Sequence, residues 1–132
     1  MGEAYLCEAE AGGGIVYDKD KRYRGTEFNV SNEKAIFKKD DKGFWIAHEF
    51  PESDYSIKYS CNENKNVNEE MIGLVCKRPN TYDYWGEYEL YIPKLRYVFV
   101  RSVGWEGFSP EELGIGMPQL TPHIIVGKCS KI

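Results

Sequence analysis

Apolar and polar positions alternate most regularly between residues 87 and 100, inside the aromatic and β-branched run 82–108. The alternation stops at Pro93 and Lys94 and then resumes, which predicts a β-hairpin with its turn at this point. Pro93 suits a type I turn better than the primed turns of two-residue hairpins, so the type of turn stays open. Six large apolar side chains then share one face of the ribbon, paired as Tyr88 with Phe99, Leu90 with Tyr97 and Ile92 with Leu95.

Shorter runs of the same kind cover the rest of the chain. We expect the glycines at 12–14 to interrupt the first of them as a bulge or a flexible turn, because no phosphate-loop signature follows. Residues 33–39 fit a short helix or a strand, and the polar turn after them favours a hairpin with 44–48. Outside the central hairpin, the expected strands are 4–7, with 15–17 as the part of the same run after the glycines, 26–30, 35–37, 44–48, 55–60, 72–76 and 123–129.

This spacing of short strands predicts an all-β fold. Eight or nine strands without a long helical pattern fit a small antiparallel barrel, lipocalin-like or similar, or a sandwich. A single helical turn is expected at Ser109, where proline and glutamate follow as in a capped helix start, and Gly114 ends it. With 132 residues and no linker, the whole chain 1–132 is expected to form one β domain.

Composition excludes several classes of partner. The chain is 42% hydrophobic with a net charge of −4, and its basic residues are interspersed with acidic ones. No basic face is available for a phosphate backbone, so nucleic acid and anionic membranes are not expected partners. No apolar run approaches the roughly 20 residues needed to span a bilayer, so no membrane span is expected.

The four cysteines indicate an oxidising compartment. They form an even set without a Cys-x-x-Cys pair, which favours two disulfides over a zinc site or free thiols. Cys61 and Cys76 lie at facing ends of the hairpin predicted from 55–60 and 72–76, so they are expected to pair. Cys7 is then left for Cys129, which would join the first strand to the last, as in a closed or nearly closed barrel.

Three local patterns resemble a group of small exported bacterial proteins. They are Tyr5-x-Cys7, Leu95-Arg96-Tyr97 leading to Gly104-Trp105, and the ending from Thr121-Pro122 to Gly127-Lys128-Cys129-Ser130. The group is uncharacterised, so the resemblance implies a periplasmic or secreted location and supplies no catalytic residue. The chain begins Met1-Gly2-Glu3 without the charged and apolar regions of a signal peptide, so we expect any export signal to have been removed.

Candidate chemistry is sparse. His48 and His123 lie near no metal or nucleophile motif, and each is expected to be a surface or edge histidine. No catalytic residue, metal site or cofactor is therefore predicted. A small hydrolase remains an alternative, because paired carboxylates can come from separate strands.

Aromatic residues flank the central hairpin on the side away from its turn. They either cap the barrel mouth as core or form a recognition patch, since Tyr and Trp dominate many binding surfaces. We predict a non-enzymatic exported binding protein that takes a small apolar ligand or a protein partner at this end, with a secreted hydrolase inhibitor as an alternative. The candidate ligand-binding residues are Tyr84, Trp85, Trp105 and Phe108.

Overall fold

The structure is a computed structural model that describes residues 3–17, 20, 22–54, 56–78, 86–101 and 122–132. The helical turn predicted at Ser109 lies outside these residues. The described strands are β1 (Ala4–Tyr17), β2 (Tyr23–Glu27), β3 (Lys34–Lys39), β4 (Trp45–Glu49), β5 (Tyr59–Lys65), β6 (Met71–Lys77), β7 (Glu87–Tyr91), β8 (Arg96–Arg101) and β9 (His123–Lys131).

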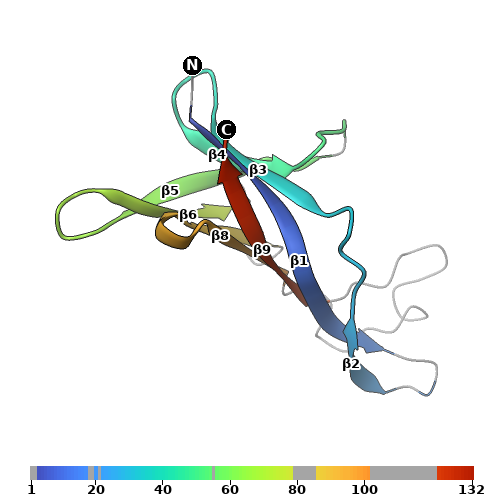
Figure 1. Cartoon of the computed structure of the whole chain (residues 1–132). Coiled ribbons are helices and arrows are strands. Elements are labelled where there is room, and N and C mark those ends of the chain that lie inside the picture. The colour runs from blue at the N-terminus through green and yellow to red at the C-terminus, as the bar shows by residue number, and fades with distance from the viewer. Residues whose placement is uncertain (1–2, 18–19, 21, 55, 79–85, 102–121) are drawn as a thin grey trace.

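The strands form a closed antiparallel barrel with one extra strand (Figure 1). The sheet runs β1-β3-β4-β5-β6-β7-β8-β9, and pairing of β1 with β9 closes it. The prediction of an all-β barrel is confirmed, and closure excludes the sandwich. Strand β2 lies outside the ring and pairs with the last residues of β1, from Gly13 to Tyr17.

The central hairpin has the predicted register. Tyr88 lies opposite Phe99 and Leu90 opposite Tyr97 in the β7–β8 ladder. The turn is wider than Pro93-Lys94 alone, because the 3₁₀ turn η2 (Ile92–Lys94) is followed by Leu95 in the left-handed region, with φ of 51°. The Leu95 amide donates to the Ile92 carbonyl at 3.1 Å, so the loop between the paired strand ends has four residues.

Strand β1 corrects the expectation that the glycines at 12–14 interrupt it. The strand continues through them for 14 residues, and its one register shift against β9 falls between Ala9 and Ala11. Glycine is needed at these positions because a neighbouring backbone segment approaches closely, and no turn is formed. A Cβ at Gly14 would collide with the Pro122 carbonyl oxygen, and one at Gly127 on β9 would collide with the Glu8 carbonyl oxygen.

Two other strands, β2 and β5, differ from their predicted ranges by three residues or more at each end. Strand β5 begins only at Tyr59 and continues through the polar residues up to Lys65, where the sequence suggested a loop. The turn is therefore short, and the Asn66 side-chain oxygen caps it by accepting from the amides of Asn68 and Glu70. Strand β2 starts and ends three residues before the predicted strand 26–30.

Apolar side chains pack inside the barrel. Inward side chains from all eight ring strands form a continuous apolar core, in which Phe37 and Leu74 are fully buried. Trp45 packs against Tyr5 with ring centroids 6.1 Å apart, and its indole N–H donates to Glu63. Core members that do not line the cavity include Tyr5, Phe37, Trp45, Leu74 and Leu90.

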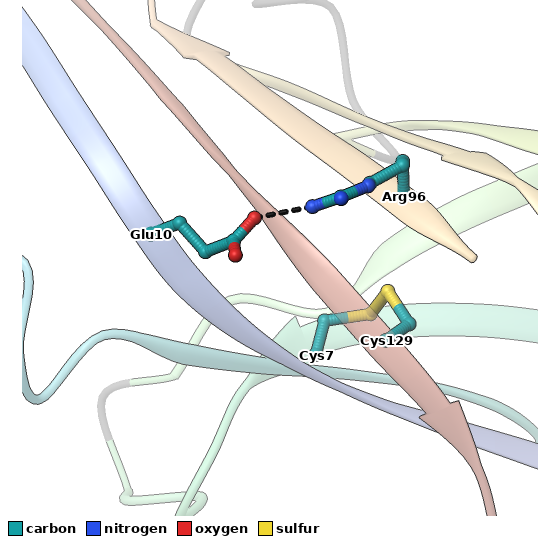
Figure 2. Close-up of a disulfide and its surroundings, with 4 residues drawn as sticks. All are labelled: Cys7, Glu10, Arg96 and Cys129. Atoms are coloured by element: carbon teal, nitrogen blue, oxygen red, sulfur yellow. Dashed lines mark hydrogen bonds and ion pairs between the residues drawn. A yellow bond between two sulfur atoms is a disulfide. The ribbon is translucent and has the colours of Figure 1, made fainter. Parts of the chain in front are cut away.

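Both disulfides form in the predicted pairing. Cys7 and Cys129 lie directly opposite each other on β1 and β9, as do Cys61 and Cys76 on β5 and β6. Figure 2 shows the first bridge together with an ion pair between Glu10 on β1 and Arg96 on β8, which spans the intervening strand β9. The covalent bond and the ion pair therefore reinforce the same closure.

Candidate functional site

A cavity of about 380 Å³ lies inside one end of the barrel and is partly open to solvent. It lies toward the open end of the β7–β8 hairpin, away from the turn at Pro93, and its wall comes from strands on all sides of the ring. The lining residues are Glu33, Lys34, Ala35, Glu49, Ile57, Tyr59, Tyr88, Tyr97, Phe99, Arg101, His123 and Ile125.

Aromatic rings make up much of the cavity wall. The Tyr88 and Phe99 ring centroids lie 4.5 Å apart, and Tyr59 packs edge-on against both rings at 5.0 and 6.1 Å. These are ordinary separations for favourable aromatic pairs. Phe37, which does not line the cavity, packs edge-on against Tyr88 and Tyr97 within the core.

Charged side chains line the same cavity near the strand ends. Arg101 and His123 are direct partners in the β8–β9 ladder, and the His123 ring lies 5.8 Å from that of Phe99. Glu49 ends β4, where the Ser56 hydroxyl donates to its carboxylate at 2.9 Å and orients it. Glu33 directly precedes β3 and is held by a backbone bond from the Ala9 amide to its carbonyl.

The phenols of the cavity wall are poor acids in this setting. Burial raises the pKa of Tyr97 to about 12, with a smaller contribution from the Glu33 carboxylate. Burial also raises the pKa of Tyr88. For Tyr59, burial again raises the pKa, while Arg101 opposes the shift and Glu49 adds to it. The Tyr59 hydroxyl therefore lies within electrostatic reach of an acid and a base that line the cavity.

His48 is not the surface or edge residue that the sequence suggested. It is 2% exposed, and its Nδ1 lies 2.7 Å from the Glu49 carbonyl oxygen. Its Nε2 lies 4.0 Å from the Glu52 carboxylate, which also contacts Lys58 at 3.4 Å. Because His48 points out of the barrel at the end of β4, it holds the following segment against the outer wall and does not line the cavity.

A second concavity of about 490 Å³ lies on the outer face near the same end. Its wall is almost wholly apolar and includes Ile15, Val100 and Ile124, together with the backbone of Gly13 and Gly14. Ile15 and Ile124 are 43% and 52% exposed, so this face is an uncovered apolar strip in the described part of the barrel.

The predicted ligand-binding residues Tyr84, Trp85, Trp105 and Phe108 all lie outside the described residues. The structure instead brings together residues that the sequence did not single out, among them Tyr59, Glu49 and Arg101. Their signal was weak but present, because each occupies an inward position at or near the end of a strand. The sequence pattern predicted Tyr97 as a core residue and His123 as a surface or edge residue, and it indicated a cavity for neither of them.

The described residues contain neither a cluster of metal-binding side chains nor a membrane-spanning helix. No three His, Cys, Asp or Glu side chains in this part of the chain are grouped so that they could hold a metal ion. None of its helices has the length and apolarity to cross a membrane.

Fold and site together define a closed antiparallel β-barrel with a partly open cavity at the end away from the turn at Pro93. Comparison of the chain with protein-family models, curated proteins and solved structures found no match. The resemblance to exported bacterial proteins therefore stays a prediction.

Proposed function

We propose that this protein is a non-enzymatic, exported binding protein that holds a small molecule in the cavity of its barrel. The observation that supports this proposal most directly is the cavity. Its volume of about 380 Å³ falls within the range of ~300–1,000 Å³ typical of small-molecule sites. Its wall combines aromatic rings with a few charged groups, the usual division between apolar contact and orientation in such sites.

The cavity favours a small ligand over the protein partner that the sequence left open. A stable protein interface needs about 800 Å² of protruding or flat surface on each side, whereas Tyr59, Tyr88 and Tyr97 are buried and face inward. These rings are accessible only to a molecule that enters the barrel. Rigidity supports the same reading, because Cys7–Cys129 and Cys61–Cys76 fix the ring around a preformed cavity.

The exported location rests on the same disulfides. Cross-links of this kind persist in oxidising compartments and are rare in reducing ones. All four cysteines are paired, and both bridges lie inside the barrel. A periplasmic or secreted location is the setting in which this covalent framework would form and last.

Filling the cavity tests the proposal. Ala35 lines the cavity at 2% exposure and lies between Cys7 and Glu49 in the β1–β3–β4 ladder. Ala35→Leu should weaken binding of the fluorescent probe anilinonaphthalene sulfonate by at least about tenfold, because the larger side chain occupies the space that the probe needs. Ala11→Leu, on an exposed position of β1, is the matched control and should leave binding unchanged.

Circular dichroism and urea denaturation would verify that both variants keep the wild-type fold. Equal probe binding by folded Ala35→Leu and wild-type protein would contradict the proposal. The same conclusion would follow if folded wild-type protein failed to bind the probe.

A further inference from the structure

The charged residues of the cavity do not require a charged ligand. Glu33 and Glu49 are exposed to solvent, and the Glu49 carboxylate already accepts a hydrogen bond from the Ser56 hydroxyl at 2.9 Å. Arg101 and His123 are half-buried and have interactions within the protein. Solvent and neighbouring protein groups therefore stabilise these side chains, so the polar groups that a ligand would satisfy must lie deeper in the cavity.

Three buried tyrosines line that deeper part. Tyr59 on β5, Tyr88 on β7 and Tyr97 on β8 are 7%, 8% and 3% exposed. Within the described residues, none of the three hydroxyls has a hydrogen-bond partner, and burial and nearby titratable groups alone determine their acidity. A buried tyrosine hydroxyl usually has such a partner. These hydroxyls are therefore the polar groups of the wall that a bound molecule would satisfy.

The three hydroxyls lie in one region, with Tyr88 at its centre. Burial is the main cause of the raised pKa of Tyr88, and the phenols of Tyr59 and Tyr97 raise it further. Both neighbours therefore lie within electrostatic range of the Tyr88 hydroxyl. The Tyr59 ring also packs edge-on against Tyr88, with centroids 5.0 Å apart. A polar group of a ligand beside Tyr88 thus has three hydroxyls in its surroundings.

The same surroundings disfavour negative charge. Burial raises the pKa of all three phenols, and the carboxylates of Glu49 and Glu33 add to the rise at Tyr88. The tyrosines are therefore protonated at neutral pH and can donate hydrogen bonds. An anionic group of a ligand beside Tyr88 would meet the same desolvation and the same repulsion as the phenolate. The hydroxyls are thus suited to an uncharged partner.

We propose that the ligand is an uncharged molecule with a ring-sized apolar body and a hydrogen-bond-accepting oxygen, such as an aromatic ketone, and that this oxygen accepts from Tyr88 and its neighbours Tyr59 and Tyr97. This inference rests on the proposed function, because it concerns the same cavity. The rings of Tyr88 and Phe99 and the side chain of Ile125 provide contact area for the apolar body. An acceptor fits better than a donor, because the ring of a phenol withdraws electron density from its oxygen. A wholly apolar ligand would leave the hydroxyls without a partner, which is unfavourable.

Four compounds of nearly the same size and shape separate these possibilities by isothermal titration calorimetry. Acetophenone carries an uncharged acceptor, and α-methylstyrene replaces its oxygen with a methylene group. Benzoate carries a negative charge and benzamidine a positive charge on the same planar frame. Acetophenone should bind at least about tenfold more tightly than each of the other three, since a site with hydrogen-bonding groups rejects analogues that leave those groups unpaired.

Removal of single hydroxyls assigns the donors. Tyr88→Phe keeps the ring and should weaken acetophenone binding by about tenfold, roughly the worth of one hydrogen bond, without weakening α-methylstyrene binding. Tyr91→Phe is the matched control, because Tyr91 lies on the same strand and is 49% exposed. Tyr59→Phe and Tyr97→Phe should change the two affinities in the same direction as Tyr88→Phe, and they carry the test should that variant fail to fold by circular dichroism.

The outcomes distinguish this inference from the proposed function. If α-methylstyrene binds as tightly as acetophenone, or if benzoate or benzamidine binds most tightly, the uncharged acceptor is wrong while the cavity remains a binding site. Unchanged acetophenone affinity in all folded tyrosine variants would also overturn it. If none of the four compounds binds but anilinonaphthalene sulfonate does and Ala35→Leu weakens it, the uncharged acceptor is again wrong and the proposed function stands. If that probe also fails to bind folded protein, the proposed function itself is overturned.

Discussion

Cys7 and Cys129 lie opposite each other on β1 and β9, and the bond between them fastens the two strands whose pairing closes the barrel. The residues are separated by 122 positions in the sequence, whereas Cys61 and Cys76 are separated by 15. The first bridge ties together the two ends of the chain, and the second stabilises one hairpin within the wall. Their contributions to stability should therefore differ.

Removing the long-range bridge should destabilise the protein more than removing the short one. In the chain-entropy model a loop of about 100 residues corresponds to roughly 4.7 kcal/mol and one of about 15 residues to roughly 3 kcal/mol. Urea denaturation of Cys7→Ser/Cys129→Ser and Cys61→Ser/Cys76→Ser should show this order. A larger loss for the Cys61–Cys76 variant would mean that barrel closure depends little on the terminal bridge.

The inward face of the central hairpin should dominate its contribution to stability. Leu90 is 3% exposed and lies in the core, so Leu90→Ala should cost about 2–5 kcal/mol. Glu89 points outward from the same strand, and Glu89→Ala should change stability by less than about 0.5 kcal/mol. If Glu89→Ala lowered the denaturation midpoint more than Leu90→Ala, the assignment of Leu90 to the inward face would be wrong.

Gly127 should tolerate no side chain. A methyl group there would meet the Glu8 carbonyl oxygen and the Tyr97 ring, so Gly127→Ala should cost about 1–3 kcal/mol through overpacking. Gly25 on β2 is the matched control, because the nearest atom to its added Cβ lies at 4.0 Å. Thermal unfolding should separate the two variants, and equal midpoints would argue against the close approach of β1 and β9.

Alkaline pH should destabilise the barrel through its buried phenols. The pKa of Tyr97 rises from 10.0 to about 12 on folding, so its protonated form is favoured in the folded state. The associated stability is fully present below about pH 10 and is lost as pH rises toward 12. Urea midpoints of Tyr97→Phe should fall less over this range than those of the wild type. Parallel pH profiles would show that Tyr97 titrates normally.

The sequence predicted much of the fold because local patterning determined it. The register of Leu90 with Tyr97 follows from a period of two, and Cys61 with Cys76 follows from the hairpin that carries them. The continuous strand β1 could not be predicted, because the tight contact at Gly14 depends on Pro122, more than a hundred residues away.

The cavity was harder to predict for the same physical reason. An inward tyrosine such as Tyr59 has the same sequence pattern whether it packs against a neighbour or borders empty space. Only the curvature of the closed ring determines which inward positions meet and which leave a gap. That Glu49 and Arg101 line one cavity likewise depends on strand order around the ring, and the spacing of residues along the chain does not reveal it.

The most direct test of a ligand site inside the barrel is to map chemical-shift changes by nuclear magnetic resonance as anilinonaphthalene sulfonate is added. The account predicts shifts at Ala35, Tyr59 and Ile125, which line the cavity, and little change at Trp45, which packs in the core against Tyr5 and does not line it. Shifts confined to Ile15 and Ile124 on the outer groove would contradict it, because the ligand would then bind outside the barrel.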